Sequence, residues 1–263
     1  MRENTVRQKI LAGQPVINGW LSIPSSYSAE IMGHAGFDAI TIDLQHGMIG
    51  IDAALPMFQA LSATPTIPLA RVPWNDPAQI MRLLDTGAYG IICPMISTVE
   101  DAENFVRSCR YPPRGQRSFG PARGLLYGGA DYYPHADREI LAIGMIETAQ
   151  GLDNLDQILA IEGLDGIYVG PNDLALALGC VPQSESEEKV VVDAIAHICS
   201  RTRAANKIAG MFCSSGEAAA KRIREGFHMV TPGNEGSMLA NAARAALAAA
   251  RQSGPTPVGQ SGY

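Results

Sequence analysis

The chain has 263 residues, of which 46% are hydrophobic and 17% are charged, and its formal net charge is −6 at pH 7. This acidic balance argues against a nucleic-acid-binding surface. No apolar run reaches the roughly 18 residues that a membrane-spanning helix needs, and the start of the chain, MRENTVRQKI, lacks the apolar core of a secretion signal. The five scattered cysteines include no CxxC pair, which disfavours a disulfide framework or a zinc site and favours the reducing cytoplasm.

Short apolar segments alternate with longer segments of helical periodicity along the chain. We predict strands at Val16–Ile23, Asp38–Asp43, Thr66–Arg71, Tyr89–Pro94, Ile140–Glu147, Gly166–Gly170, Ile208–Phe212 and His228–Pro232. We predict helices at Ser28–Ala35, Ala53–Ser62, Pro77–Thr86, Val99–Cys109, Leu152–Ile161, Glu187–Ala205, Ser215–Glu225 and Glu235–Arg251. Apolar strands that alternate with helices indicate a parallel sheet covered by helices. At this length we favour a closed TIM (β/α)8 barrel over an open doubly wound sheet, as one domain over residues 1–252.

Two segments depart from this alternation. Arg110–Arg138 is long and rich in Gly, Pro, Arg and Tyr, and long loops of this kind are often functional or lie between subunits. The end of the chain, Ser253–Tyr263, has little to bury, and we expect it to be a flexible tail.

Polar residues end several of the predicted strands. In a barrel enzyme, the carboxyl-terminal ends of the strands and the loops that follow them carry the chemistry. The polar residues at these ends are Asp43, Gln45, His46, Arg71, Glu147 and Asp173.

Glu147 and Asp173 lie one strand–helix unit apart, so adjacent strands bring them to the same rim. Two carboxylates in one concave site resist ionisation unless a cation neutralises them. A divalent ion that prefers oxygen ligands fits such a pair. The alternative is that each residue only caps a helix.

The segment GPND around Gly170 and Asn172 adds a tight turn and the start of a short helix. Backbone N–H groups at a helix start bind carboxylate or phosphate, so a small acid held beside the metal is one interpretation. The other interpretation is that the segment is only a turn and binds no ligand.

Arg71 and His46 are the remaining candidates. A guanidinium at the end of a barrel strand is costly to bury without an acidic partner, and it can stabilise negative charge on a substrate oxygen. A salt bridge without catalytic role is the alternative. His46 follows Asp43 by three residues and can act as acid or base near neutral pH, although a lone loop histidine is usually a solvated side chain.

Several stretches of the sequence resemble one known family. These stretches are SSYSAEIMGHAGFDAITIDLQHG, RVPWNDPAQIMRLLDTGAYGIICPMI, RYPPRGQRSFG, IETAQGLDNLDQILAIEGLDGIYVGPNDLALALG and the final helix. They are similar to the metal-dependent, class II pyruvate aldolases of the HpcH/HpaI family, which includes 4-hydroxy-2-oxoheptanedioate aldolase and 2-dehydro-3-deoxyglucarate aldolase. The resemblance covers residues 15 to 250, and the motifs IET and GPNDL at their spacing are its most specific part.

The resemblance implies a phosphoenolpyruvate/pyruvate-type barrel that cleaves 4-hydroxy-2-oxo acids, reversibly, to pyruvate or hydroxypyruvate and an aldehyde through a metal-stabilised enolate. By resemblance, Glu147 and Asp173 bind Mg²⁺, Mn²⁺ or Co²⁺, and backbone amides around Gly170 and Asn172 hold the substrate carboxylate. Arg71 holds the keto or enolate oxygen. Since no lysine ends a predicted strand in the matched motifs, a Schiff-base aldolase is disfavoured.

The resemblance also implies an assembly and an acid–base group. Asp43, His46 and Asp85 form that group, and Asp85 reaches it from a neighbouring subunit. The alanine-rich final helix, Glu235–Arg251, is exchanged between subunits in a homohexamer built as a trimer of dimers. The apolar face of this helix is also wider than a surface helix of a monomer needs, which favours a contact with another chain.

Two positions depart from the family pattern. Met145 stands where relatives usually have Gln, and Gln45 stands where many have Glu, so polarity or charge is lost beside the substrate. Two other functions remain open. One is an acyl-CoA lyase of the malyl-CoA or citryl-CoA type, for which the chain is short, and the other is an inactive ligand-binding barrel subunit.

Overall fold

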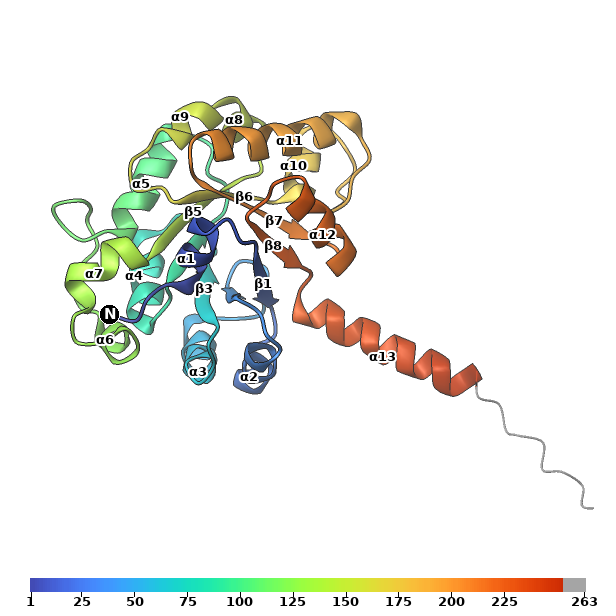
Figure 1. Cartoon of the computed structure of the whole chain (residues 1–263), viewed down its shortest axis with the longest axis horizontal. Coiled ribbons are helices and arrows are strands. Elements are labelled where there is room, and N and C mark those ends of the chain that lie inside the picture. Colours follow the sequence, from blue (N-terminus) through green and yellow to red (C-terminus); the bar gives the residue numbers. More distant parts are fainter. Residues whose placement is uncertain (253–263) are drawn as a thin grey trace, which may run out of the picture.

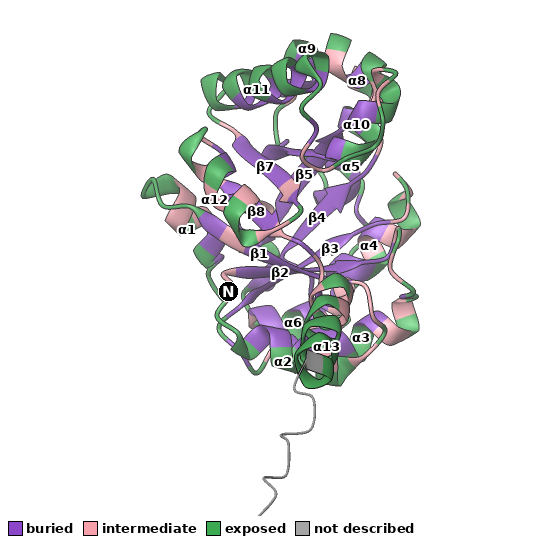
Figure 2. Cartoon of the chain, turned by 90° about the vertical axis from the view of Figure 1, so that its right-hand side faces the viewer, coloured by how far each residue is buried: buried purple, intermediate pink, exposed green. Residues whose placement is uncertain are grey.

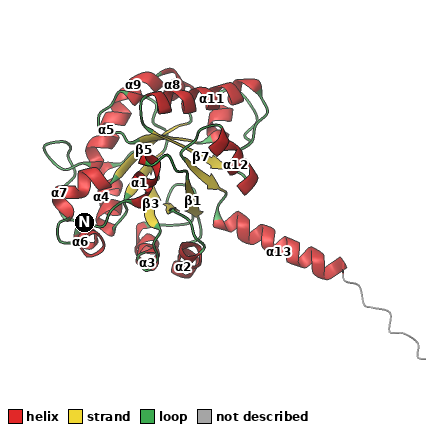
Figure 3. Ribbon diagram, in the orientation of Figure 1, coloured by secondary structure: helices red, strands yellow, loops and turns green. Residues whose placement is uncertain are grey.

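The computed structural model describes residues 1–252, in which eight parallel strands form a closed barrel surrounded by helices (Figures 1 and 3). Each strand pairs with the next one in the chain, and β1 pairs with β8 to close the ring. The strands are β1 (Val16–Leu21), β2 (Ala39–Asp43), β3 (Ile67–Arg71), β4 (Gly90–Cys93), β5 (Leu141–Ile146), β6 (Gly166–Val169), β7 (Ile208–Cys213) and β8 (Met229–Pro232). The predicted TIM-type (β/α)8 barrel is confirmed.

Helices cover the outer face of the barrel and expose their outer sides, whereas the strands are buried (Figure 2). The helices are α1 (Thr5–Leu11), α2 (Ser26–His34), α3 (Ile51–Leu61), α4 (Pro77–Thr86), α5 (Val99–Cys109), α6 (Ala122–Gly128), α7 (Tyr132–Glu139), α8 (Ala149–Asp153), α9 (Leu155–Leu159), α10 (Pro171–Ala177), α11 (Lys189–Ala204), α12 (Gly216–Arg224) and α13 (Glu235–Gln252). No helix of the described part is long and apolar enough to cross a membrane.

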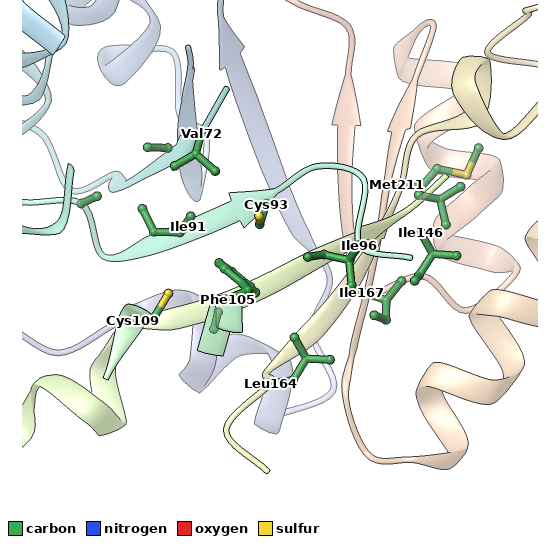
Figure 4. Packing of buried hydrophobic residues seen from close by; sticks show 14 of the residues in the cluster. Val72, Ile91, Cys93, Ile96, Phe105, Cys109, Ile146, Leu164, Ile167 and Met211 are labelled. Atoms are coloured by element: carbon green, nitrogen blue, oxygen red, sulfur yellow. The ribbon is translucent and has the colours of Figure 1, made fainter. Parts of the chain in front are cut away.

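The strands are apolar because both of their faces are buried. On the outer face, Ile91, Ile146 and Ile167 belong to one cluster of buried hydrophobic residues with Phe105 of α5 and Leu164 (Figure 4). Inside the barrel, aromatic and aliphatic side chains fill the space as a packed core. Charge therefore enters β2 and β3 only at their last residues, which lie at the rim.

A buried polar network lies one layer below that rim. The Asn18 amide donates to the hydroxyls of Thr41 and Thr231 at 3.0 and 2.9 Å, and the Tyr168 hydroxyl lies 2.5 Å from that of Thr231. These partners satisfy polar groups that would otherwise be costly to bury. The network gives the candidate site a rigid floor.

The segment Arg110–Arg138, predicted as a break in the alternation, contains α6 and α7. The glycines of α6 allow close packing: a Cβ on Gly128 would lie 2.6 Å from the Tyr132 ring. Arg123 donates from this segment to the Thr86 carbonyl at 2.7 Å. Tertiary packing therefore overrides the weak helix propensity of a glycine-rich sequence.

Other differences lie at helix boundaries. α1 was not expected; Asn4 caps it, and Val6 from its first turn is buried in the barrel interior. The single helix predicted at Leu152–Ile161 is two short helices, α8 and α9, which meet at Asn154.

The final helix, α13, projects away from the barrel (Figure 1). Its start is buried at Glu235, whereas Leu239 and Leu247 farther along are exposed. The predicted tail, Ser253–Tyr263, lies outside the described residues.

Candidate functional site

A pocket of about 240 Å³ opens at the carboxyl-terminal rim of the barrel. Strand ends and the loops after them supply its lining residues, which are Trp20, Ser22, Asp43, His46, Arg71, Met145, Glu147, Tyr168, Gly170, Pro171, Asn172, Asp173, Phe212 and Asn234. Every site residue predicted from the sequence lies in this lining except Asp85.

A larger cavity of about 650 Å³ lies at the opposite end of the barrel. Two of its cations are already bonded to the protein. Arg7 donates to Asp165 at 2.6 Å, and Lys207 donates to the carbonyls of Ile161 and Leu164. Because barrel enzymes work at the other rim, we take the smaller pocket as the candidate active site.

Asp43 and Arg71 form one wall of the pocket. They are register partners at the ends of β2 and β3, and the Arg71 Nε and Nη2 atoms donate to the two Asp43 carboxylate oxygens at 2.8 and 2.6 Å. Burial opposes the charged form of Asp43, but these hydrogen bonds and the Arg71 charge outweigh it and lower its pKa. Within residues 1–252 the Arg71 Nη1 atom has no hydrogen-bond partner, so its N–H groups are available to a substrate oxygen.

Trp20 contacts both residues of this pair, although nothing in the sequence distinguishes it from a core residue. Its indole N–H donates to Asp43 at 3.1 Å, and the Arg71 guanidinium carbon lies 4.9 Å from the centre of its ring. The hydrogen bond and the cation–π contact together restrict the guanidinium to one orientation.

Glu147 follows β5 directly and forms the opposite wall. Its side chain is buried, and its Oε1 atom accepts the Met95 N–H at 2.8 Å. The pKa of Glu147 is raised to about 7, and burial is the main cause. The Met95 N–H lowers the pKa, and the nearby Asp173 charge raises it. Without a cation, this carboxylate therefore resists ionisation.

Met95 aims its N–H at Glu147 from a left-handed backbone conformation, with a φ of 59°. This conformation costs a residue other than glycine about 1–3 kcal/mol and is concentrated at functional sites. Nothing in the sequence distinguishes Met95 from a core residue, so it was not predicted.

Gly170 and Asp173 bring α10 close to Glu147. A Cβ on Gly170 would lie 2.1 Å from the Glu147 Oε2 atom, so only glycine permits this approach. Gly170 is the N-cap of α10, and Asp173 and Asn172 lie exposed in its first turn. Asp173 is therefore not the N-cap residue of this helix.

The donor set fits a hard divalent cation. Glu147 and Asp173 are both carboxylates that line the pocket, and within residues 1–252 the Glu147 Oε2 atom accepts no hydrogen bond. Among the described residues no group of three or more His, Cys, Asp or Glu side chains could hold an ion. Two protein ligands would leave the remaining positions of such a cation to water and substrate, as in open catalytic sites.

His46 lies exposed at the mouth of the pocket. Its backbone N–H, 3.3 Å from Asp43, is the group that contacts this carboxylate, so Asp43 does not orient the His46 imidazole within one chain. The neighbouring Gln45 has a buried side-chain oxygen without a hydrogen-bond partner in the described part of the chain.

Met145 and the aromatic residues make part of the pocket apolar. Met145 is buried beside Tyr168, its register partner on β6. The Trp20 ring contacts the Tyr168 and Phe212 rings, with centroids 5.7 and 5.6 Å apart. These aromatic residues look like ordinary core residues in the sequence, and only the folded structure shows that they line the pocket.

Asp85 lies on α4, outside the pocket of its own chain. It accepts a 2.7 Å hydrogen bond from Arg117, which also donates to the Tyr132 hydroxyl at 3.1 Å. Burial raises the pKa of Asp85, and Arg117 lowers it in part. A role for Asp85 in a site therefore requires a second subunit.

Residues 17–242 match the family described as HpcH/HpaI aldolase/citrate lyase. The chain is 43% identical to hydroxypyruvate/pyruvate aldolase of Rhizorhabdus wittichii over 248 residues, which cover 94% of this chain and 99% of that one. It is 36% identical to 4-hydroxy-2-oxo-heptane-1,7-dioate aldolase of Shigella sonnei, with 94% of each chain covered.

Solved structures agree with these relatives. An HpcH/HpaI aldolase/citrate lyase family protein from Burkholderia cenocepacia superimposes with a TM-score of 0.89 at 31% identity, covering 94% of this chain and 99% of that one. The chain thus belongs to the HpcH/HpaI aldolase/citrate lyase family and is a carbon–carbon lyase.

Proposed function

We propose that this enzyme cleaves 4-hydroxy-2-oxo acids, reversibly, to an aldehyde and pyruvate or hydroxypyruvate. The observation that carries the proposal is one small pocket with a carboxylate pair, Glu147 and Asp173, facing the Asp43–Arg71 clamp. Its volume of about 240 Å³ suits a small acid. The relative named hydroxypyruvate/pyruvate aldolase supports hydroxypyruvate as a donor.

Glu147 and Asp173 would hold a divalent cation, for which Mg²⁺, Mn²⁺ and Co²⁺ are the candidates. When bound, the cation acts as a Lewis acid on the carboxylate and keto oxygens of a 2-oxo acid. The N–H groups around Gly170 and Asn172 would orient the substrate carboxylate.

Arg71 would stabilise the enolate oxygen through its Nη1 N–H groups, because Asp43 occupies the other side of the guanidinium. His46, at the mouth, would move the proton of the substrate hydroxyl or C3 carbon. Met145 and Phe212 would make part of the pocket apolar and limit the access of water there.

The assembly that we propose is a homohexamer, a trimer of dimers, in which α13 is exchanged between subunits and Asp85 of the partner subunit joins His46. The exposed Leu239 and Leu247 on α13 support an apolar contact with another chain. The free cysteines support a reducing compartment, the cytosol.

The test is a cleavage and addition screen of the Mn²⁺-loaded protein with pyruvate and hydroxypyruvate against a panel of aldehydes. We expect turnover with at least one aldehyde, and none in Glu147→Gln. A parallel screen of malyl-CoA and citryl-CoA separates the acyl-CoA lyase alternative. Turnover of a thioester alone contradicts the proposal, and no turnover of either class favours the inactive barrel.

A further inference from the structure

Glu235 is a buried carboxylate that binds the loop after β1. Its exposed fraction is 5%, and it is the first residue of α13. The Ser22 N–H donates to both of its oxygens at 2.8 Å, and the Ile23 N–H donates to Oε1 at 2.8 Å. The Ser22 hydroxyl and the Gly236 N–H donate to Oε2 at 3.0 Å.

This carboxylate does not line the pocket, although its neighbours do. Ser22 and Asn234 are both part of the lining, and Glu235 connects these two loops from behind. Charge-assisted hydrogen bonds from several donors are among the stronger polar contacts in proteins. The loop after β1 therefore cannot move independently of the start of α13.

The loop after β1 in turn holds the loop that carries His46. The Met48 N–H donates to the Ser22 carbonyl at 3.0 Å. Gly47 packs so closely here that a Cβ on it would lie 3.1 Å from the Ser22 Cα atom and 2.2 Å from the Asp43 carbonyl oxygen. A continuous series of contacts thus runs from Glu235 through Ser22 to Gly47 and Met48, the two residues that follow His46.

We propose that Glu235 is a positioning residue that sets the placement of His46 in the pocket and couples it to the seating of α13. The inference rests on the proposed function, in which His46 moves the proton. A displacement of about 1 Å at a catalytic group can cost about 100-fold in rate. Any change in how α13 packs then reaches the acid–base group directly.

Glu235→Gln tests the inference because it keeps the shape and removes one acceptor oxygen. In the holoenzyme we expect kcat for aldol cleavage to fall about 10- to 100-fold, with KM for the 2-oxo acid and the affinity for Mn²⁺ unchanged. Glu217→Gln is the matched control, since Glu217 is an exposed first-turn acid of another helix, and it should retain the wild-type kcat.

A double-mutant cycle separates positioning from a general structural effect. In a His46→Asn background, Glu235→Gln should cause no further loss of kcat. Full additivity of the two losses, at an unchanged molecular mass, would overturn the inference.

The ring signal of His46 provides a readout independent of activity. In labelled protein, assigned with His46→Asn, the Cε1–H resonance should shift or broaden in Glu235→Gln and stay unchanged in Glu217→Gln. If Glu235→Gln fails to fold, Ser22→Ala removes one of the bonds and should move the same signal. An unmoved His46 signal overturns the inference, whereas absent cleavage by the wild type refutes only the proposed function.

Discussion

A buried arginine next to a buried aspartate can serve stability, catalysis or both. Asp43 neutralises Arg71 and receives two of its donors, while the third nitrogen remains available at the pocket. Trp20 also contacts both residues, through a hydrogen bond to Asp43 and a cation–π contact with Arg71. The pair therefore stabilises the rim and also presents a preorganised donor, and these two roles make different predictions.

For catalysis, Arg71→Ala should lower kcat/KM by about 10²–10³-fold or more, as expected for loss of a single oxyanion donor. Arg71→Lys should restore only part of the rate, because an ammonium group cannot reproduce the planar fork. Steady-state kinetics on the folded variants measure both effects. An alanine variant that keeps most of its rate would show that Arg71 is only a salt-bridge residue.

For stability, the lowered pKa of Asp43 predicts a pH dependence. A carboxylate whose pKa is lowered by folding stabilises the fold above its ordinary value of 3.8, and that stabilisation is lost as the pH falls through the folded-state pKa. Asp43→Asn should therefore lower the free energy of unfolding by about 3 kcal/mol or more near neutral pH. In urea unfolding at a series of pH values, the difference in unfolding free energy between the wild type and Asp43→Asn should become smaller below pH 3.8. A difference that does not change with pH would contradict the assignment.

Individual polar residues were predictable because charge at the end of an apolar strand has few structural explanations. Asp43, Arg71 and Glu147 follow that rule and line the pocket. Trp20 and Phe212 do not, since an aromatic residue inside a strand is typical of a core. The residue type of Met95 does not indicate that its backbone adopts the left-handed conformation.

At the scale of elements, the turn from β6 into α10 is built around one close contact. Gly170→Ala would put a Cβ 2.1 Å from the Glu147 Oε2 atom. We expect Glu147 to be displaced and the affinity for Mn²⁺ to fall about 10- to 100-fold, the usual effect of disturbing the support of a metal ligand.

The matched control is Gly216→Ala, because a Cβ at Gly216 meets nothing within 4 Å. It should bind Mn²⁺ as the wild type does, measured by calorimetry under the same conditions. Equal affinities for the two variants would contradict the role given to Gly170.

The strands were more predictable than the helices around them. Strand positions follow from apolar runs that must be buried on both faces, and all eight were found. α6 and α7 depend on tertiary contacts such as the packing of Gly128 on Tyr132, which no local pattern encodes. α1 has too few apolar residues to show a clear period.

In the assembly of the whole molecule, we predict that the active site is shared between subunits. Asp85 lies outside its own pocket, paired with Arg117, and α13 projects away from the barrel (Figure 1). Activity should therefore fall on dilution into the monomer range. Mixing Asp85→Asn with His46→Ala should restore part of the activity, because some sites then combine intact residues from both chains.

Light scattering with parallel assays checks this prediction. A mass near the 27.9 kDa of one chain, at full specific activity, would exclude both the exchanged helix and the shared site. The family resemblance in the sequence implies this assembly. One chain alone does not show the surface of the neighbouring subunit that α13 and Asp85 would contact.

We propose above all that Glu147 and Asp173 hold the cation on which the reaction depends. The most direct measurement is the exchange of the C3 hydrogens of pyruvate with deuterated water, followed by nuclear magnetic resonance after EDTA treatment and again after addition of Mg²⁺. In the wild type we expect exchange to stop on metal removal and to return with Mg²⁺. In folded Glu147→Gln and Asp173→Asn we expect it to stay absent. Wild-type exchange by a variant shown to be free of metal would contradict the proposal.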